Sequence, residues 1–142
     1  IGRYGFGLCT HVIADLPWDD RLDVAETAKI ISALPVTEVK IHSLYIVKGT
    51  KLADMYEKGE VKLLPMEEYL ERAALFISYL RKDIVIQRMV GRASGGNTIT
   101  VNGGSPWWEV KDAIHRLLEE RNIIQGCRCD YLDGAGVRHF LK

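Results

Sequence analysis

The chain has 142 residues, of which 47% are hydrophobic and 27% are charged, the usual composition of one globular domain. Nineteen Lys and Arg residues balance nineteen Asp and Glu residues, which excludes a global positive field that would hold a phosphate backbone. No apolar run approaches the roughly 18 residues of a membrane helix, and three cysteines, an odd number, favour a reducing cytoplasmic compartment over a disulfide framework.

The first part of the chain predicts two strands separated by a helix. Residues 8–14 are apolar at nearly every position, which is typical of a strand covered on both faces in a parallel sheet. The aspartates that follow this strand can cap a helix over residues 21–34. The apolar face of this helix consists of Val24, Ala28, Ile31 and Leu34. Residues 38–47 are rich in β-branched and aromatic side chains and predict a second strand.

The middle of the chain predicts two helices before a third strand. Thr50 is a good N-cap for a short helix, and Gly59 is its natural end. Residues 65–80 carry a continuous apolar stripe at helical spacing and predict a longer helix. Residues 83–90 predict the third strand.

The last part of the chain predicts a long loop and one more helix. Residues 91–104 are rich in glycine and polar side chains, with a short extended piece at 98–101. Ser105 as N-cap and Pro106 as the first helical residue begin a helix that ends at residue 122, before an irregular tail. Trp107 and Trp108 open this helix, and we expect one in the core and the other beside a ligand.

This order of elements predicts an α/β fold with about three parallel strand-helix units. A complete TIM barrel spends about 250 residues on eight such units, so the chain is either a slice of a partial TIM-type barrel or a small open sheet. In both folds the loops after the strands share one edge of the sheet, and this edge holds the functional site. The loops are residues 16–20, 48–62 and 91–104.

Four basic side chains inside the predicted strands are candidates for chemistry at that edge. His11 and His42 lie shortly before the ends of the first two strands, and they either face one ligand or form a hydrogen-bonded pair in the core. Lys40 and Arg88 each need a partner inside a buried sheet, either a ligand carboxylate or a structural one. The structural candidates are Asp15 and Asp83.

The cysteines do not make a metal-binding pattern. Cys127 and Cys129 form a C-x-C in a tail that also carries His139, which is at most half of a zinc site. Cys9 lies in the first strand, where packing is its expected role. We therefore predict no metal ligands in this chain.

Several runs of the sequence, taken in order, resemble the carboxyl-terminal half of radical SAM proteins. They are THVIADLPWDD, VKIHSLYIVKGTKLADMYEKGE, PMEEYLERAALFISYL, DIVIQRMVG and SPWWEVKDAIHRLL. The resemblance spans about residues 8–126, and its most specific parts are the Lys-x-His-x-Leu-x-x-x-x-Gly-Thr run at 40–50 and the Pro-Trp-x-x-x-Lys run at 106–111. The group is an uncharacterised one, related to oxygen-independent coproporphyrinogen III oxidase and to the Elongator catalytic subunit.

The resemblance implies a full or partial TIM-type barrel that binds a 4Fe-4S cluster through a C-x-x-x-C-x-x-C loop and cleaves S-adenosylmethionine (SAM) to a 5′-deoxyadenosyl radical. This chain lacks that cysteine loop, so we expect the cluster ligands in a missing N-terminal half before Ile1. We expect the chain alone to form no cluster and to be catalytically inert. Residues 1–126 then belong to the barrel, and residues 127–142 form the tail.

The resemblance also implies a SAM-binding segment at the end of the first strand. The family motif G-x-I-x-G-x-x-E corresponds to the residues HVIADLPWD at positions 11–19. From it we expect cofactor contacts from His11, Ile13, Asp15 and Asp19. The residues expected to bind the substrate are Lys40, His42 and Arg88.

The implied function is that of one part of a cytoplasmic radical SAM oxidoreductase whose substrate the sequence does not identify. Neutral net charge gives no support to tRNA as a partner. The alternative is a non-enzymatic α/β module that offers a binding surface to a partner. We also expect the chain by itself to self-associate, because its first strand would lack an upstream neighbour.

Overall fold

A computed structural model describes residues 4–92 and 96–131. The helices and strands are, in chain order, β1 (Cys9–Ile13), α1 (Arg21–Ala33), β2 (Glu38–His42), β3 (Ile46–Val47), α2 (Lys51–Glu57), α3 (Met66–Tyr79), β4 (Val85–Arg88), β5 (Thr98–Thr100), the 3-10 turn η2 (Asn102–Gly104) and α4 (Trp107–Glu120).

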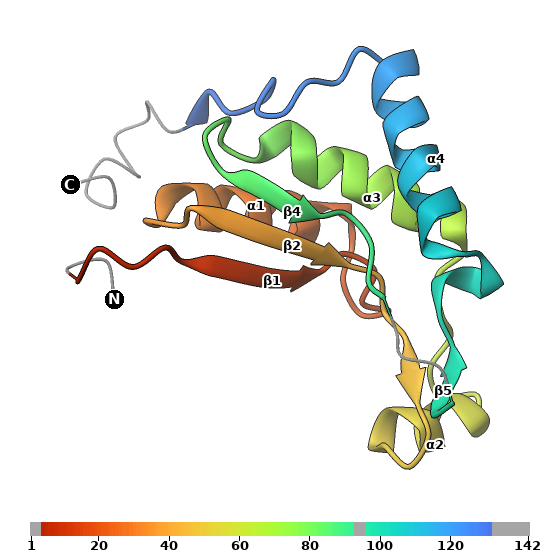
Figure 1. Ribbon diagram of the computed structural model, residues 1–142. Helices are drawn as coiled ribbons and strands as arrows, with labels where there is room; N and C mark the ends of the chain where they lie inside the picture. The colour runs from red at the N-terminus through yellow and green to blue at the C-terminus, as the bar shows by residue number, and fades with distance from the viewer. Residues whose placement is uncertain (1–3, 93–95, 132–142) are drawn as a thin grey trace.

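Three parallel strands form the main sheet, in the order β1-β2-β4. Their carboxyl ends all point to the same edge, as the arrowheads in Figure 1 show. The α/β class with three parallel strands is therefore confirmed. The segments that follow the three strands meet at this edge, where parallel sheets bring their functional loops together.

Helices α1 and α3 pack on one face of the sheet and bury it (Figure 1). Val39 and Ile41 of β2 are fully buried in this core, together with Ala28 of α1 and Phe76 of α3. Alternate residues of a strand point to opposite faces, so the residues between them point away from the helices. We call this second side of the sheet the open face.

The expectation that the first strand is covered on both faces is wrong. Val12 packs against the core, but its neighbours His11 and Ile13 are exposed, and Ile13 keeps 42% of its surface in contact with solvent. The physical reason is that among the described residues only one face of β1 meets helices. An apolar run alone does not reveal whether a second layer is present.

The strand predicted over residues 38–47 is split in two. Strand β2 ends at His42, and β3 pairs antiparallel with β5 in a separate two-stranded sheet. Between them the amide of Leu44 donates to the carboxylate of Asp15 at 2.6 Å, and the hydroxyl of Ser43 donates to the side-chain oxygen of Asn102. These side-chain partners replace the strand ladder, so the chain can turn there. Together with α2, β3 and β5 form an arm that projects from the main sheet in Figure 1.

The helix ends follow the predicted capping with two corrections. Asp20 caps α1 and Thr50 caps α2, as expected. However, Leu34 lies beyond the end of α1 and is 39% exposed, so it does not extend the apolar face. Pro106 rather than Ser105 occupies the N-cap position of α4, and it makes no side-chain cap, because proline offers no side-chain acceptor.

The chain after α4 returns to the carboxyl end of α3. The amide of Gly126 donates to the carbonyl of Ile77 at 3.1 Å, and the amide of Arg128 donates to that of Ser78 at 2.8 Å. Residue 139, in the predicted tail, lies outside the described residues. Within the described ranges, no helix has both the length and the apolar character needed to cross a bilayer.

Candidate functional site

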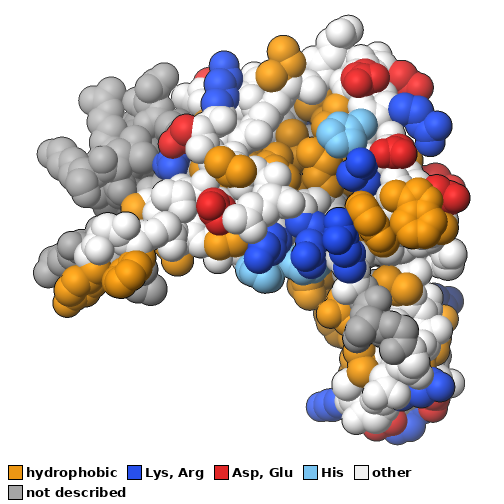
Figure 2. Space-filling model, in the orientation of Figure 1, with side chains coloured by type: hydrophobic (Ala, Val, Ile, Leu, Met, Phe, Trp, Pro, Cys, Tyr) orange, Lys and Arg blue, Asp and Glu red, His pale blue; other side chains and the backbone are white. Residues whose placement is uncertain are grey.

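The predicted site residues from all three parallel strands meet on the open face. The strand register places His11 opposite Lys40, Ile13 opposite His42, and Lys40 opposite Arg88. Residues in register share a face of the sheet, so these five side chains form one surface. Figure 2 shows Lys and Arg side chains gathered beside histidine over the ends of the strands.

The two histidines contact each other directly. Nε2 of His42 and Nδ1 of His11 lie 3.2 Å apart, and the rings are stacked with centroids separated by 5.2 Å. A hydrogen bond at this distance needs one donor and one acceptor nitrogen, so one ring is the donor and the other the acceptor. The pair is hydrogen-bonded, as one of the sequence alternatives proposed, but it lies on the open face and not in the core.

The charges around the pair keep His42 neutral. Burial lowers the pKa of His42, and the nearby His11, Arg88 and Lys40 lower it further. A neutral imidazole has one donor and one acceptor nitrogen, so the ring nitrogen of His42 that does not contact His11 can form a hydrogen bond with a ligand. The surface as a whole is electropositive and suits an anionic ligand.

The structural ion pairs suggested for Lys40 and Arg88 are absent from the described part of the chain. No carboxylate there lies within ion-pair distance of either cation. Asp83 instead pairs with Arg81, and Asp15 accepts the backbone hydrogen bond from Leu44. Both side chains are half-buried on the open face, where solvent and an anionic ligand can each reach them.

Asp15 lies in the interior, behind the end of β1, and is 8% exposed. Burial raises the pKa of its carboxyl to about 6, and the hydrogen bond from Leu44 offsets this only in part. Tyr69 lies nearby, and its hydroxyl donates to the carbonyl of Met89 at 2.6 Å. Burial raises the pKa of this hydroxyl, and the charge of Asp15 raises it further. Asp15 thus ties the end of β1 to the segment after β2.

Arg72 of α3 holds the loop after β1, and sequence reasoning did not identify it. Its guanidinium is buried and donates to the carbonyls of Leu16 at 3.3 Å and Asp19 at 2.8 Å. It also contacts Glu68 at 3.0 Å. Hydrogen bonds from Arg21, and next from Arg72, lower the pKa of Glu68 to about 2. The one sequence signal was the i,i+4 spacing of Glu68 and Arg72.

Asn102 is a second residue that the sequence did not identify. It is 5% exposed, has a positive φ of 51°, and binds the hydroxyl of Ser43 and the carbonyl of Gly91. It therefore links the segments after β2 and β4. A Cβ on Gly91 would lie 3.4 Å from Nδ1 of His42, at ordinary contact distance, so this segment packs directly against the imidazole.

A cavity of about 300 Å³ opens at the histidine pair. Its lining residues come from β1, β2 and the segment after β2, and they are His11, Ile13, His42, Ser43, Leu44 and Tyr45. The cavity combines a neutral imidazole with apolar walls, so it can orient a small polar group. Asp19 stays half-buried in the loop that Arg72 holds, beside the start of α1.

The described residues do not fit an iron-sulfur cluster. Such a cluster needs three or four thiolates converging on one point, and no group of three His, Cys, Asp or Glu side chains within residues 4–92 and 96–131 is arranged to hold a metal. Cys9 lies on β1, whereas Cys127 and Cys129 lie beyond α4. No chemical step is therefore assigned to a cluster held by this chain.

A family model described as the Radical_SAM C-terminal domain matches residues 36–120. The uncharacterised protein YtqA of Bacillus subtilis is 33% identical over 128 residues, which cover 87% of this chain and 38% of YtqA. An uncharacterised protein of Methanocaldococcus jannaschii is 36% identical over 131 residues, covering 89% of this chain and 39% of that protein. The chain thus spans 38–39% of the length of these relatives.

A solved structure has the same fold. The Elp3 protein of the archaeon Methanocaldococcus infernus, with an N-terminal deletion, superposes with a TM-score of 0.71 at 18% sequence identity. The match covers 96% of this chain and 33% of that protein. At this identity the likeness concerns the fold alone.

Proposed function

Because the chain belongs to the radical SAM C-terminal domain family, we propose that it forms the carboxyl-terminal wall of a radical SAM enzyme, with its open face turned toward the reacting molecules. The observation that carries the proposal is the set of ligand-facing groups on this face. Lys40 and Arg88 have no carboxylate partner in the described structure, and they flank a hydrogen-bonded histidine pair. Titratable groups gathered at the carboxyl edge of a parallel sheet are typical of a ligand site.

The adenine and ribose of SAM carry polar groups that suit the cofactor side of this surface, at the end of β1. In such an enzyme SAM supplies a 5′-deoxyadenosyl radical when a reduced 4Fe-4S cluster cleaves it. We assign contacts with the cofactor to His11 and Ile13, at the end of β1, and to the loop that carries Asp15 and Asp19. The cluster ligands belong to residues outside this chain, because its cysteines do not converge.

The substrate side of the surface is formed by β2 and β4. Lys40 and Arg88 bind and orient an anionic group, and neutral His42 forms a hydrogen bond beside it. Burial of Asp15 and the Arg72 contacts to the loop carbonyls keep the cofactor side in place.

The test is SAM cleavage in the longer protein, reconstituted anaerobically with iron and sulfide. His42→Ala and Asp19→Ala should each weaken SAM binding or cleavage by about tenfold or more, the effect of one lost hydrogen bond to a charged group. Lys58→Ala is the matched control, because Lys58 is exposed at the end of α2, in the projecting arm. 5′-Deoxyadenosine formation and equilibrium SAM binding are the readouts.

Full activity and affinity in both variants, with intact circular dichroism spectra, would remove these residues from the site. A longer protein that neither binds SAM nor forms 5′-deoxyadenosine would contradict the enzyme proposal itself. It would favour the alternative of a non-enzymatic binding module.

A further inference from the structure

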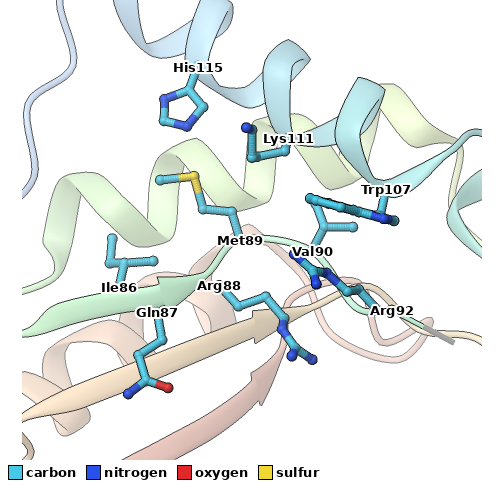
Figure 3. Close-up of a pocket in the computed structure, with 9 residues that line it drawn as sticks. All are labelled: Ile86, Gln87, Arg88, Met89, Val90, Arg92, Trp107, Lys111 and His115. Atoms are coloured by element: carbon cyan, nitrogen blue, oxygen red, sulfur yellow. The ribbon is translucent and has the colours of Figure 1, made fainter.

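A second cavity lies outside the histidine site, between the free edge of β4 and helix α4. Its volume is about 340 Å³, and Figure 3 shows the side chains that line it. Strand β4 is the last strand of the sheet, so its outer edge faces this space. We call this cavity the β4–α4 pocket.

The rim of the β4–α4 pocket is basic and carries no acid. Arg92 approaches from the segment after β4, and Lys111 and His115 approach from α4, whereas the side chain of Arg88 extends to the other side of the strand (Figure 3). None of the nine lining residues is Asp or Glu. In the described part of the chain, the one carboxylate paired with a rim cation is Asp112, which contacts Lys111 at 3.3 Å and is itself 61% exposed. Exposed pairs of this kind are weak.

The floor of the pocket is apolar. Val90 is buried, and Ile86 and Met89 pack against the hydrophobic core. Figure 3 shows Met89 pointing toward α4, on the side opposite to Arg88. An apolar floor below a basic rim suits a ligand with a hydrophobic body and an anionic end.

Trp107 holds Arg92 in position by stacking on its guanidinium, and this contact does not use the N–H donors of Arg92. The guanidinium carbon of Arg92 lies 3.8 Å from the centre of the indole ring. A stacked guanidinium keeps its N–H groups in its own plane, where they can form a fork for a carboxylate or phosphate. Among the described residues, no carboxylate or backbone oxygen accepts a hydrogen bond from this side chain.

We propose that the β4–α4 pocket binds a small organic anion. Its carboxylate or phosphate contacts Arg92 and Lys111, and its flat apolar body lies on Met89 and Val90. The volume is at the lower end of the range for small-molecule sites, so it limits the ligand to about one ring with its anionic group. This site does not depend on radical chemistry, and its test does not require the longer protein.

The experiment is a titration of the 142-residue chain labelled with ¹⁵N, followed by the indole N–H signal of Trp107. Phenyl phosphate and benzoate are the probes. Inorganic phosphate is the control ligand without a ring, and benzyl alcohol is the control ligand without a charge. The variants Arg92→Gln and Lys111→Gln remove rim cations, Lys111→Arg keeps the charge, and Lys58→Gln is a control outside the pocket. The indole signal of Trp18, which is exposed on the loop after β1, monitors unspecific effects.

We expect at least one ring-bearing anion to shift the Trp107 signal to saturation at concentrations up to about 10 mM. Each Gln variant should weaken this binding by about tenfold, and Lys111→Arg and Lys58→Gln should leave it nearly unchanged. Stronger binding of phenyl phosphate than of benzoate assigns a phosphate end, and the reverse assigns a carboxylate end.

Three results would overturn the proposal. They are equal affinity in the wild type and both Gln variants, equal affinity for benzyl alcohol and the anions, and the absence of any saturable shift. Inorganic phosphate that binds as tightly as phenyl phosphate would overturn the assignment of the apolar floor. Circular dichroism of each variant shows whether the fold is intact.

Discussion

At the scale of single residues, Asp15 carries a carboxyl group whose charged form is disfavoured by burial. Its carboxyl oxygen accepts a hydrogen bond from the Leu44 amide at 2.6 Å, and burial makes the charged form costly and raises the pKa from 3.8 to about 6. Between these two values the folded protein binds more protons at this carboxyl than the unfolded chain does. The contribution of Asp15 to stability is therefore complete below about pH 4 and is lost as the pH rises through about 6.

Asp15→Asn should remove this pH dependence, because the amide oxygen can still accept the Leu44 hydrogen bond and carries no charge. At pH 7.5 or so the variant should be more stable than the wild type by up to about 3 kcal/mol, the equivalent of a shift of roughly two pKa units. Near pH 4 the advantage should vanish. Urea unfolding of both proteins at the two pH values measures it, and the difference between them cancels all other titrating groups, His42 included. A constant difference across the pH range would contradict the assignment of the shift to Asp15.

The residues of the open face were predictable from the sequence, whereas the residues that support them were not. His11, Lys40, His42 and Arg88 sit near the carboxyl ends of strands, and parallel pairing brings such ends together. Arg72 is different, because its partner carbonyls lie more than fifty positions earlier in the chain. A contact between residues so far apart in the sequence leaves no local sequence pattern.

At the scale of elements, helices with strong local signals were predicted well, and the second strand was not. Asp20 and Thr50 form caps through contacts within three residues, so the sequence contains the whole interaction. The break after His42 depends on Asn102, 59 residues beyond its partner Ser43. The β-branched and aromatic composition of residues 38–47 predicted one continuous strand, but tertiary contacts divide this segment into β2 and β3.

The capping box of α1 provides a test at this scale. The side chain of Asp20 accepts from the amides of Leu22 at 2.6 Å and Asp23 at 3.1 Å, and the carboxylate of Asp23 accepts from the amide of Asp20 at 2.8 Å. Asp20→Ala leaves the first amides of the helix without this acceptor and should lower the free energy of unfolding by about 1 kcal/mol. Asp20→Asn keeps an acceptor and is the matched control.

The measurement for this pair of variants is chemical denaturation at neutral pH, with the helix signal in circular dichroism as the probe. We expect Asp20→Asn to unfold at nearly the wild-type midpoint and Asp20→Ala at a lower one, with the same dependence on denaturant. If both variants lost the same stability, the charge of Asp20 rather than its cap would be responsible. Because Asp20 directly follows the loop held by Arg72, loss of the cap should also loosen the proposed cofactor side of the open face.

At the scale of the whole molecule, the family resemblance seen in the sequence motifs is confirmed. Within residues 4–92 and 96–131, helices cover only one face of the sheet. The relatives are more than twice as long as the match, and the Elp3 structure shares the fold over nearly all of this chain. We infer that in the longer protein further strands continue the sheet beyond β1 and close the space in front of the open face. The boundary proposed at residue 126 stays a prediction.

The backbone pattern of β1 shows which groups are available for such pairing. The carbonyl of Leu8 accepts from Glu38, and the amide of Ala14 donates to the carbonyl of His42, so the even-numbered residues of this strand pair with β2. The amides and carbonyls of Cys9, His11 and Ile13 therefore point outward from the sheet. No lysine, proline or acid protects this edge between residues 8 and 14.

We therefore expect the 142-residue chain, studied alone, to self-associate through the edge of β1, in the simplest case as a two-fold dimer. Cys9→Pro should weaken this association, because proline at the first position of an edge strand removes an outward N–H without breaking a hydrogen bond to β2. Cys9→Ser keeps the amide and is the control for loss of the thiol, with a reducing agent present throughout. Light scattering over a dilution series measures the mass of all three proteins. A wild type that is monomeric at high concentration would show that the open edge is tolerated as it stands, and would favour a self-contained α/β module over the wall of a larger barrel.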